Sequence, residues 1–122
     1  MILVDTDVLI DFLRGLPASK AFIMENKDEI SFSAITEAEL LSGKKCDDAR
    51  EKERTIHLLS FFEKVPVDNP LVQIAGDLRR KYGIETPDSI IAASALYTDA
   101  TLVTRNIKHF ERLPGLKVKK PY

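Results

Sequence analysis

The sequence predicts an α/β domain in which a central, mainly parallel sheet of about five strands is covered by helices on both faces. Short apolar runs alternate with amphipathic helical patterns along the chain, which is typical of such a sheet. The first apolar run, residues 2–4, ends on an acid, Asp5, as expected of a buried strand that delivers a side chain to its carboxyl end. With 122 residues, the chain has the length of a single domain, 1–122.

Strands are predicted from short apolar runs, and helices from apolar residues that recur every three or four positions. The expected strands are Ile2–Val4, Ile30–Ser33, Lys64–Val67, Thr101–Thr104 and Leu116–Lys119. The expected helices are Val8–Arg14, Ala18–Glu25, Glu37–Ser42, Asp48–Phe62, Pro70–Tyr82, Asp88–Tyr97 and Ile107–Arg112.

Glycines and prolines support these boundaries. Gly15 and Gly43 follow helical patterns, where glycine commonly closes a helix in the left-handed conformation. Pro70 and Pro87 fall in the expected first turn of a helix, where the missing N–H group costs little.

Composition favours a globular protein of a reducing compartment. Hydrophobic residues make up 44% of the chain and charged residues 30%, which argues against disorder. Cys46 is the only cysteine, so no internal disulfide can form, and the usual structural zinc ligands are missing. No apolar run approaches the length of a membrane span, and the early first strand leaves no room for a signal peptide. We therefore expect a cytoplasmic protein with no membrane partner.

Charge is unevenly distributed along the chain. The net charge is only −1, but residues 101–122 contain six basic side chains and one acidic side chain. This segment is either a surface that tolerates phosphate groups or a solvated basic tail.

Two acids from distant segments are expected at one edge of the sheet. The run Asp5-Thr6-Asp7 follows the first strand and crowds more negative charge there than helix capping requires. Asp88 opens a helix that leads almost directly into the strand at 101–104, so its first turn should lie at the carboxyl edge, beside Asp5. Ligands bind at this edge in open α/β sheets.

A third acid, Glu39, opens the helix that follows the second strand. Thr36 and Glu39 also fit a capping box, in which the glutamate only stabilises the start of its own helix, and Glu37 is a competing acid on the same turn. If Glu39 joins Asp5 and Asp88, the site is rich in hard oxygen ligands and suited to Mg²⁺ or Mn²⁺.

Whether a remaining polar residue precedes or follows a strand predicts the edge of the sheet at which it lies. Thr104, Arg105 and Asn106 end or follow the fourth strand and should lie at the carboxyl edge. Asp99 precedes that strand and should lie at the opposite end, which argues against a catalytic role.

Other titratable residues are expected to have supporting or structural roles. Asp7 and Asp11 lie one helical turn apart. We expect Asp11 to be solvated, and Asp7 to contact the metal ligands without binding the metal itself. His57 and His109 are expected to pack against their apolar neighbours.

With these residues in place, the chain resembles a PIN-domain nuclease, specifically a VapC-type toxin of prokaryotic toxin–antitoxin modules. Four segments in this order carry the resemblance: ILVDTDVLIDFL, SAITEAELLSG, TPDSIIAASA and LVTRNIKHF. The resemblance implies a three-layer α/β/α PIN-like domain. It also implies an Mg²⁺- or Mn²⁺-dependent endoribonuclease that hydrolyses RNA phosphodiester bonds, often in tRNA or other structured RNA, and so inhibits translation.

The resemblance also assigns residues and partners. By motif, Asp5, Glu39 and Asp88 become the acidic catalytic and metal-binding residues. Asn106 takes the fourth catalytic position, often aspartate in the wider family, which keeps an oxygen ligand but removes a charge that a second metal would need. The implied partners are a second copy of the chain in a homodimer and a VapB-like antitoxin that keeps the toxin inactive.

The mechanism expected for such a site is hydrolysis by a metal-activated water. Side chains expected to orient the water or the acids are Thr6, Asp7 and Thr104. Side chains expected to bind the RNA backbone are Arg105, Lys108 and Arg112, with Arg79, Arg80 and Lys81 as further candidates. Exposed apolar residues between 37 and 62 are the expected surface for the antitoxin or the dimer.

Three alternatives remain open from the residues alone. A phosphate-accepting receiver domain would use Asp68, Thr104 and Lys120, although its final helix is missing. A haloacid-dehalogenase-type phosphatase would use Asp5 and Asp7. Such an enzyme also needs downstream acids that bind Mg²⁺, and this chain lacks them. A third alternative keeps the fold without catalysis and leaves a protein that only binds RNA or a partner.

Overall fold

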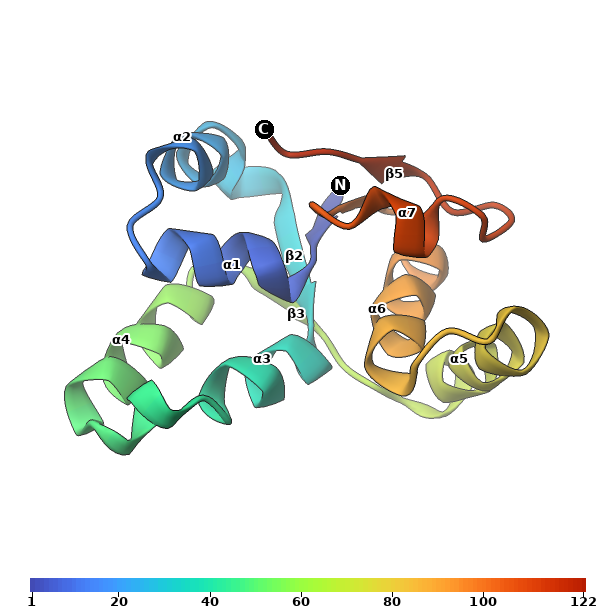
Figure 1. Cartoon of the computed structure of the whole chain (residues 1–122), viewed down its shortest axis with the longest axis horizontal. Coiled ribbons are helices and arrows are strands. Elements are labelled where there is room, and N and C mark those ends of the chain that lie inside the picture. The colour runs from blue at the N-terminus through green and yellow to red at the C-terminus, as the bar shows by residue number, and fades with distance from the viewer.

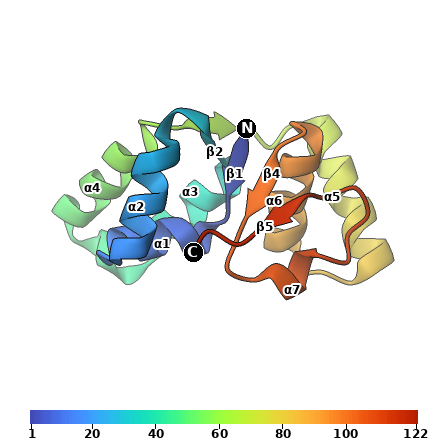
Figure 2. The ribbon, with the colours of Figure 1, turned by 90° about the horizontal axis from the view of Figure 1, so that it is seen from above.

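The computed structural model describes all 122 residues and contains one five-stranded sheet in which every strand pair is parallel. The strand order is β3-β2-β1-β4-β5. The strands are β1 (Ile2–Val4), β2 (Ile30–Ser33), β3 (Glu63–Val65), β4 (Thr101–Val103) and β5 (Val118–Lys119). The predicted α/β/α fold class with a parallel sheet of about five strands is confirmed (Figures 1 and 2).

Helices connect the strands and form the outer layers. The α-helices are α1 (Thr6–Leu13), α2 (Pro17–Asn26), α3 (Ala34–Leu41), α4 (Ala49–Leu59), α5 (Asn69–Tyr82), α6 (Thr86–Tyr97) and α7 (Ile107–Phe110). Two short 3₁₀ turns are η1 (Lys27–Glu29) and η2 (Lys44–Asp47). None of the helices combines the length and the apolar character that crossing a membrane requires.

Alternate side chains of the strands enter two separate cores, one on each face of the sheet. Leu3 and Leu102 pair in register and pack with α5 and α6, whereas Val4 and Val103 pair in register and pack with α1, α2 and α4. Figure 2 shows these helices on opposite sides of the sheet. Successive side chains of a strand therefore point to opposite faces of the sheet, and both faces are buried under helices.

Three helices begin two or more residues earlier than predicted, and in two of them a side chain at the end of the preceding strand caps the helix. The Asp5 carboxylate accepts a hydrogen bond from the Thr6 N–H group, so α1 starts at Thr6 and not at Val8. Ser33 accepts from the backbone of α3 in the same way and starts that helix at Ala34. The third, α6, begins at Thr86 with Pro87 in its first turn.

The glycine predictions are confirmed at one position and wrong at the other. Gly15 follows α1 with a φ angle of +84°, in the left-handed region that favours glycine. Gly43 has a φ angle of −68°, because the chain continues directly into η2 and does not turn away. The left-handed closure that the sequence analysis did not predict is Gly83, which ends α5 at a φ angle of +70°.

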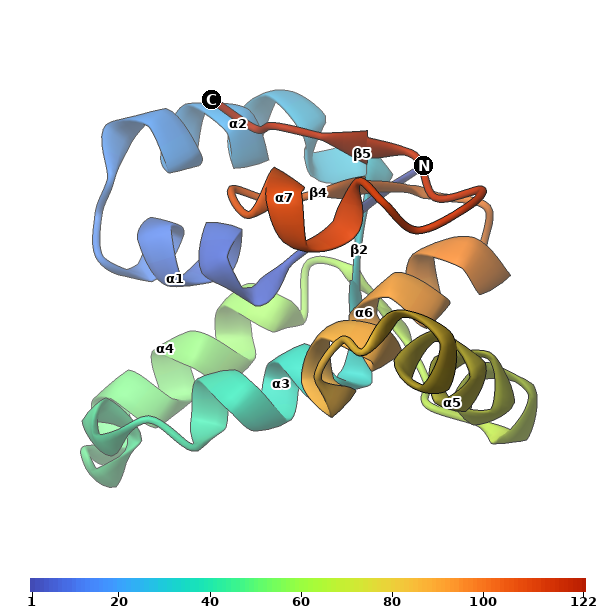
Figure 3. The same cartoon turned by 45° about the vertical axis from the view of Figure 1, so that its right-hand side comes forward.

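The strand register brings the carboxyl ends of β1, β2 and β4 to one level. Val4 pairs with Phe32 on one side and with Val103 on the other, so Asp5, Ser33 and Thr104 follow at the same edge. Figures 1 and 3 show the first turns of α1, α3 and α6 gathered beside this edge. The orientation predicted for the helix that carries Asp88 is therefore confirmed.

Candidate functional site

Asp5 lies at the centre of the carboxyl edge and is 6% exposed. Its Oδ1 atom accepts from the Thr6 backbone N–H group at 2.8 Å, and its Oδ2 atom accepts from the Thr104 hydroxyl at 2.8 Å. A carboxylate offers about four lone-pair positions, so each oxygen retains one for a further ligand. Asp5 both caps α1 and stays available for binding.

The pKa of the Asp5 carboxyl is raised to about 7, mainly by burial and next by the charge of the neighbouring Asp7 carboxylate. Hydrogen bonds from Thr104 and Thr6 oppose this shift, while the charge of Asp88 adds to it. Asp88 therefore lies close enough to Asp5 for their charges to interact, although they are far apart in the sequence. The edge holds more negative charge than its own hydrogen bonds compensate.

Glu39 faces this cluster, and the capping-box alternative for it is wrong. The capping residue of α3 is Ser33, so Thr36 already lies inside the helix, where it is fully buried. The Thr6 hydroxyl donates to Glu39 Oε1 at 2.7 Å and lies 3.0 Å from the Thr36 hydroxyl. Because Thr6 follows Asp5 directly, this contact ties Glu39 to the same edge.

Asp88 lies half-buried in the first turn of α6, and His109 of α7 is beside it. The His109 Nδ1 atom is 3.6 Å from Asp88 Oδ2, and the imidazole is 62% exposed. The predicted packing against apolar neighbours is confirmed, because the His57 ring lies edge-on to Phe61 at 5.0 Å and the His109 ring lies 6.5 Å from Phe110, although both histidines are exposed. His109 is a site residue that the sequence analysis missed, and its only signal was its place one helical turn after Arg105-Asn106.

Asp7 and Asp11 hold Arg105. The Arg105 Nε atom lies 2.8 Å from Asp11 Oδ2 and 3.9 Å from Asp7 Oδ2, and the Arg105 backbone N–H group donates to Asp7 at 3.0 Å. Asp11 is 8% exposed and also accepts from the Tyr122 hydroxyl, so the prediction that it is solvated is wrong. These contacts fix the turn after β4 against α1.

One atom of this network has no partner. Asp7 Oδ1 is buried and accepts no hydrogen bond from the protein, and burial is the main cause that raises the Asp7 pKa. A buried carboxylate oxygen without a partner is costly, so this atom has capacity for a donor or a cation.

Thr104 and Asn106 lie at the same edge. Thr104 is fully buried, and its hydroxyl accepts from the Asn106 backbone N–H group at 3.0 Å. Asn106 is exposed and precedes α7, but its side chain makes no capping bond, so its amide is free to contact a ligand. Asp99 lies before β4, at the opposite end of the strand, as predicted.

The basic side chains near the edge differ in whether they already form ion pairs or hydrogen bonds within the protein. Arg105 is neutralised by Asp11, whereas Lys108 and Arg112 are exposed and make no ion pair within 4 Å. Among the more distant candidates, Arg79 donates to a backbone carbonyl and Arg80 pairs with Asp77.

The edge thus brings together the carboxylate of Asp5, which follows β1, and carboxylates from α1, α3 and α6. No group of three or more His, Cys, Asp or Glu side chains is arranged in the structure so as to hold a metal ion on its own. An acidic edge of this kind can bind a cation with help from water and from an anionic ligand, because Mg²⁺ commonly takes only one or two carboxylates from a protein.

Comparison with known proteins excludes two of the three alternatives that the residues left open. The PIN domain family model matches residues 2–116. The chain belongs to the PIN domain family. Ribonuclease VapC19 of Mycobacterium tuberculosis is 38% identical over 96% of this chain and 98% of its own length, and Ribonuclease VapC10 of the same organism is 36% identical over 96% and 91%. The VapC-type resemblance is confirmed.

A solved structure supports the same assignment. A toxin–antitoxin complex from Klebsiella pneumoniae contains a chain that superimposes on this PIN domain with a TM-score of 0.86 and 32% identity, covering 100% of this chain and 98% of the other. The receiver-domain and phosphatase alternatives are therefore wrong. The receiver domain is also excluded by its strand order, 2-1-3-4-5, because this PIN domain has the order 3-2-1-4-5.

We expect Thr104→Val to lower the free energy of unfolding of this PIN domain by about 1–3 kcal/mol at pH 8, because Asp5 and the Asn106 N–H group both lose a buried partner. Thr104→Ser keeps the hydroxyl and should remain within about 1 kcal/mol of the wild type. Urea denaturation of the three proteins is the measurement. Equal stability of the valine and serine variants would show that this hydroxyl does not support Asp5.

Proposed function

We propose that this chain is a divalent-metal-dependent endoribonuclease and the toxin of a VapBC-type toxin–antitoxin pair. In this proposal it acts in the cytoplasm, cuts RNA phosphodiester bonds in tRNA or another structured RNA, inhibits translation, and is held inactive by a VapB-like antitoxin. Supporting this, the relatives above are named ribonucleases and the superimposed chain comes from a toxin–antitoxin complex.

The observation that carries the proposal is the meeting of Asp5 with acids from two other helices at the carboxyl edge. Asp88 interacts electrostatically with Asp5, and Glu39 is linked to it through Thr6. All three donors are hard carboxylate oxygens, which suit Mg²⁺ or Mn²⁺. The pKa of about 7 at Asp5 and the unpartnered Oδ1 atom of Asp7 show negative charge that a cation would compensate.

Each residue has a distinct proposed role. Asp5 and Asp88 hold the cation, with Glu39 as a further ligand directly or through water. When bound, the cation polarises a phosphate oxygen and lowers the pKa of an attacking water. Thr6 and Thr104 fix the orientation of the acids through their hydroxyls, and Asp7 does so through the turn at Arg105. The Asn106 amide lies at the same edge, where it can orient water or substrate.

Basic residues beside the acids are proposed to hold the RNA backbone. Lys108 and Arg112 are exposed and carry no ion pair, so their charges are available for phosphate groups. Arg105 is already paired with Asp11, and we therefore propose that it contributes mainly by fixing the turn that carries Asn106.

Exposed apolar side chains offer a place for a protein partner. Ile56 of α4 is 46% exposed, and Phe61, two residues after the end of α4, is 67% exposed. Side chains of this size outside the core are a candidate surface for the antitoxin or for a second copy of the chain.

The test is cleavage of a purified transfer RNA mixture by the purified chain. We expect fragments with Mg²⁺ or Mn²⁺, none with excess EDTA, and recovery when the metal is restored. Cleavage that persists in EDTA would contradict the metal requirement. A preparation that cuts no RNA under any of these conditions would contradict the proposed activity.

A further inference from the structure

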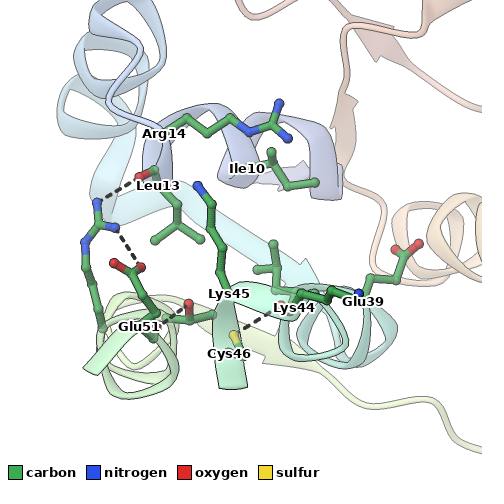
Figure 4. A pocket seen from close by; sticks show the side chains of 12 residues that line it. Ile10, Leu13, Arg14, Glu39, Lys44, Lys45, Cys46 and Glu51 are labelled. Atoms are coloured by element: carbon green, nitrogen blue, oxygen red, sulfur yellow. Dashed lines mark hydrogen bonds and ion pairs between the residues drawn. The ribbon is translucent and has the colours of Figure 1, made fainter. Parts of the chain in front are cut away.

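A pocket lies between α1, η2 and α4, beside the acidic edge. Its volume is about 300 Å³, and its apolar wall is formed by Ile10, Leu13 and Leu40. Figure 4 shows Glu39 at one end of the pocket and Glu51 at the other. This pocket was not predictable from the sequence, because its walls come from segments that are distant in the chain.

Three basic side chains at this pocket have no acidic partner. Arg14 projects from the end of α1, while Lys44 and Lys45 come from η2 on the facing side (Figure 4). All three are exposed, and none makes an ion pair within 4 Å. The pocket therefore presents three positive charges that make no ion pair, together with an apolar wall and the Glu39 carboxylate at one end.

The fourth basic side chain of the pocket is engaged differently. Arg54 pairs with Glu51 at 3.3 Å and donates to the Leu13 carbonyl at 2.9 Å. These contacts join α4 to the end of α1 and hold the far wall in place. Arg54 is thus a structural element of the pocket, and the free charge belongs to the other three.

The pocket continues directly from the acidic edge. Glu39 lines the pocket and also accepts the hydrogen bond from Thr6, the residue after Asp5. Helix α1 leads from Asp5 to Arg14, and its eight residues span about 12 Å at the rise of an α-helix. A chain of a few nucleotides would reach from the acids to these charges.

We propose that this pocket binds the phosphate backbone of single-stranded RNA on one side of the bond that is cut. The proposal rests on the proposed function, because it takes the acidic edge as the place of the cut phosphate. An RNA strand seated there must leave the edge, and the pocket offers positive charge for its phosphates and an apolar wall for a ribose or base. An acidic peptide could also satisfy the charges, but RNA is favoured because Mg²⁺ held by carboxylates commonly binds a substrate phosphate, and the same strand would continue into the pocket.

The test compares RNA binding by two triple variants of equal charge, both carrying Asp88→Asn so that the RNA stays intact. The pocket variant is Arg14→Ala with Lys44→Ala and Lys45→Ala. The control variant is Lys20→Ala with Lys27→Ala and Lys117→Ala, at exposed positions that do not line the pocket. Fluorescence anisotropy with a labelled single-stranded RNA of 12 nucleotides measures both.

We expect the pocket variant to bind this RNA at least about 10-fold more weakly than the control. The slope of log K against log salt should fall by about 2, because three phosphate contacts on a single strand contribute about 0.7 each. Equal RNA binding and equal slopes in the two variants would overturn the proposal. This holds even if an antitoxin peptide binds the pocket variant more weakly than the control, because the pocket would then be a peptide site. Absence of RNA binding in the control would overturn it as well.

A second readout separates this proposal from the proposed activity. In the background with Asp88 intact, the pocket variant should raise KM for RNA but leave hydrolysis of the small diester bis(p-nitrophenyl) phosphate unchanged. Loss of hydrolysis of the small diester would mean that the substitutions damage the acidic edge, and would count against a separate pocket. If the chain cuts no RNA yet binds it through the pocket, the proposed activity fails while the binding surface stands.

Discussion

Asp88→Asn should reduce RNA cleavage by about a thousandfold or more while the protein stays folded. Asp88 lies half-buried in the first turn of α6, and its charge interacts with that of Asp5. The amide keeps the size of the side chain but removes the negative charge that a divalent cation requires, and loss of a catalytic group commonly costs this much. Initial rates on RNA with saturating Mg²⁺, together with circular dichroism, measure the effect.

Asp99→Asn is the matched control for this prediction. Asp99 is an exposed acid at the opposite end of β4, and its φ angle of +54° is one that asparagine adopts readily. This variant should cut RNA at the wild-type rate. Wild-type activity in Asp88→Asn would show that the carboxylate of α6 takes no part in the reaction.

Asp5→Asn should make the protein more stable at pH 8 in EDTA, even though it abolishes activity. The folded state keeps the Asp5 proton up to a pH of about 7, whereas the unfolded chain releases it near its ordinary value of 3.8. Stability therefore falls as pH rises between these two values, by at most about 4 kcal/mol at this one buried group. Asparagine cannot ionise, and the Thr104 hydroxyl can reorient to accept from its amide.

The measurement is the free energy of unfolding from urea titrations at pH 4 and pH 8 in EDTA. The wild type should lose more stability between these pH values than Asp5→Asn does, and Mg²⁺ at pH 8 should restore stability to the wild type only. An identical pH dependence in both proteins would mean that Asp5 ionises freely in the folded state. No effect of Mg²⁺ on the wild type would argue against a cation at Asp5.

The sequence sufficed for the features that follow from strand order and helix direction. A short apolar run before Asp5 predicted a strand tip, and the short link from Tyr97 to Thr101 required the helix to run back along the sheet. From these two features Asp88 was expected beside Asp5, and the charges of the two residues interact in the structure. Both features depend only on chain connectivity, which one sequence contains.

Features that depend on contacts between separate helices were not predictable in the same way. Glu39 fitted a local capping motif, and only the packing of α3 against α1 directs it to Thr6. Asp11 was expected to be solvated because its partners, Arg105 and Tyr122, are about a hundred residues away in the chain. His109 was missed because the position of α7 over Asp88 is not encoded by any local periodicity.

The most direct test of the metal site is anomalous diffraction from crystals of the protein grown with Mn²⁺. We expect a single strong anomalous peak between the carboxylates of Asp5 and Asp88, with Glu39 bound directly or through water, and no such peak in Asp88→Asn. A peak elsewhere on the molecule, or an unchanged peak in that variant, would contradict the claim that these distant acids form one cation site.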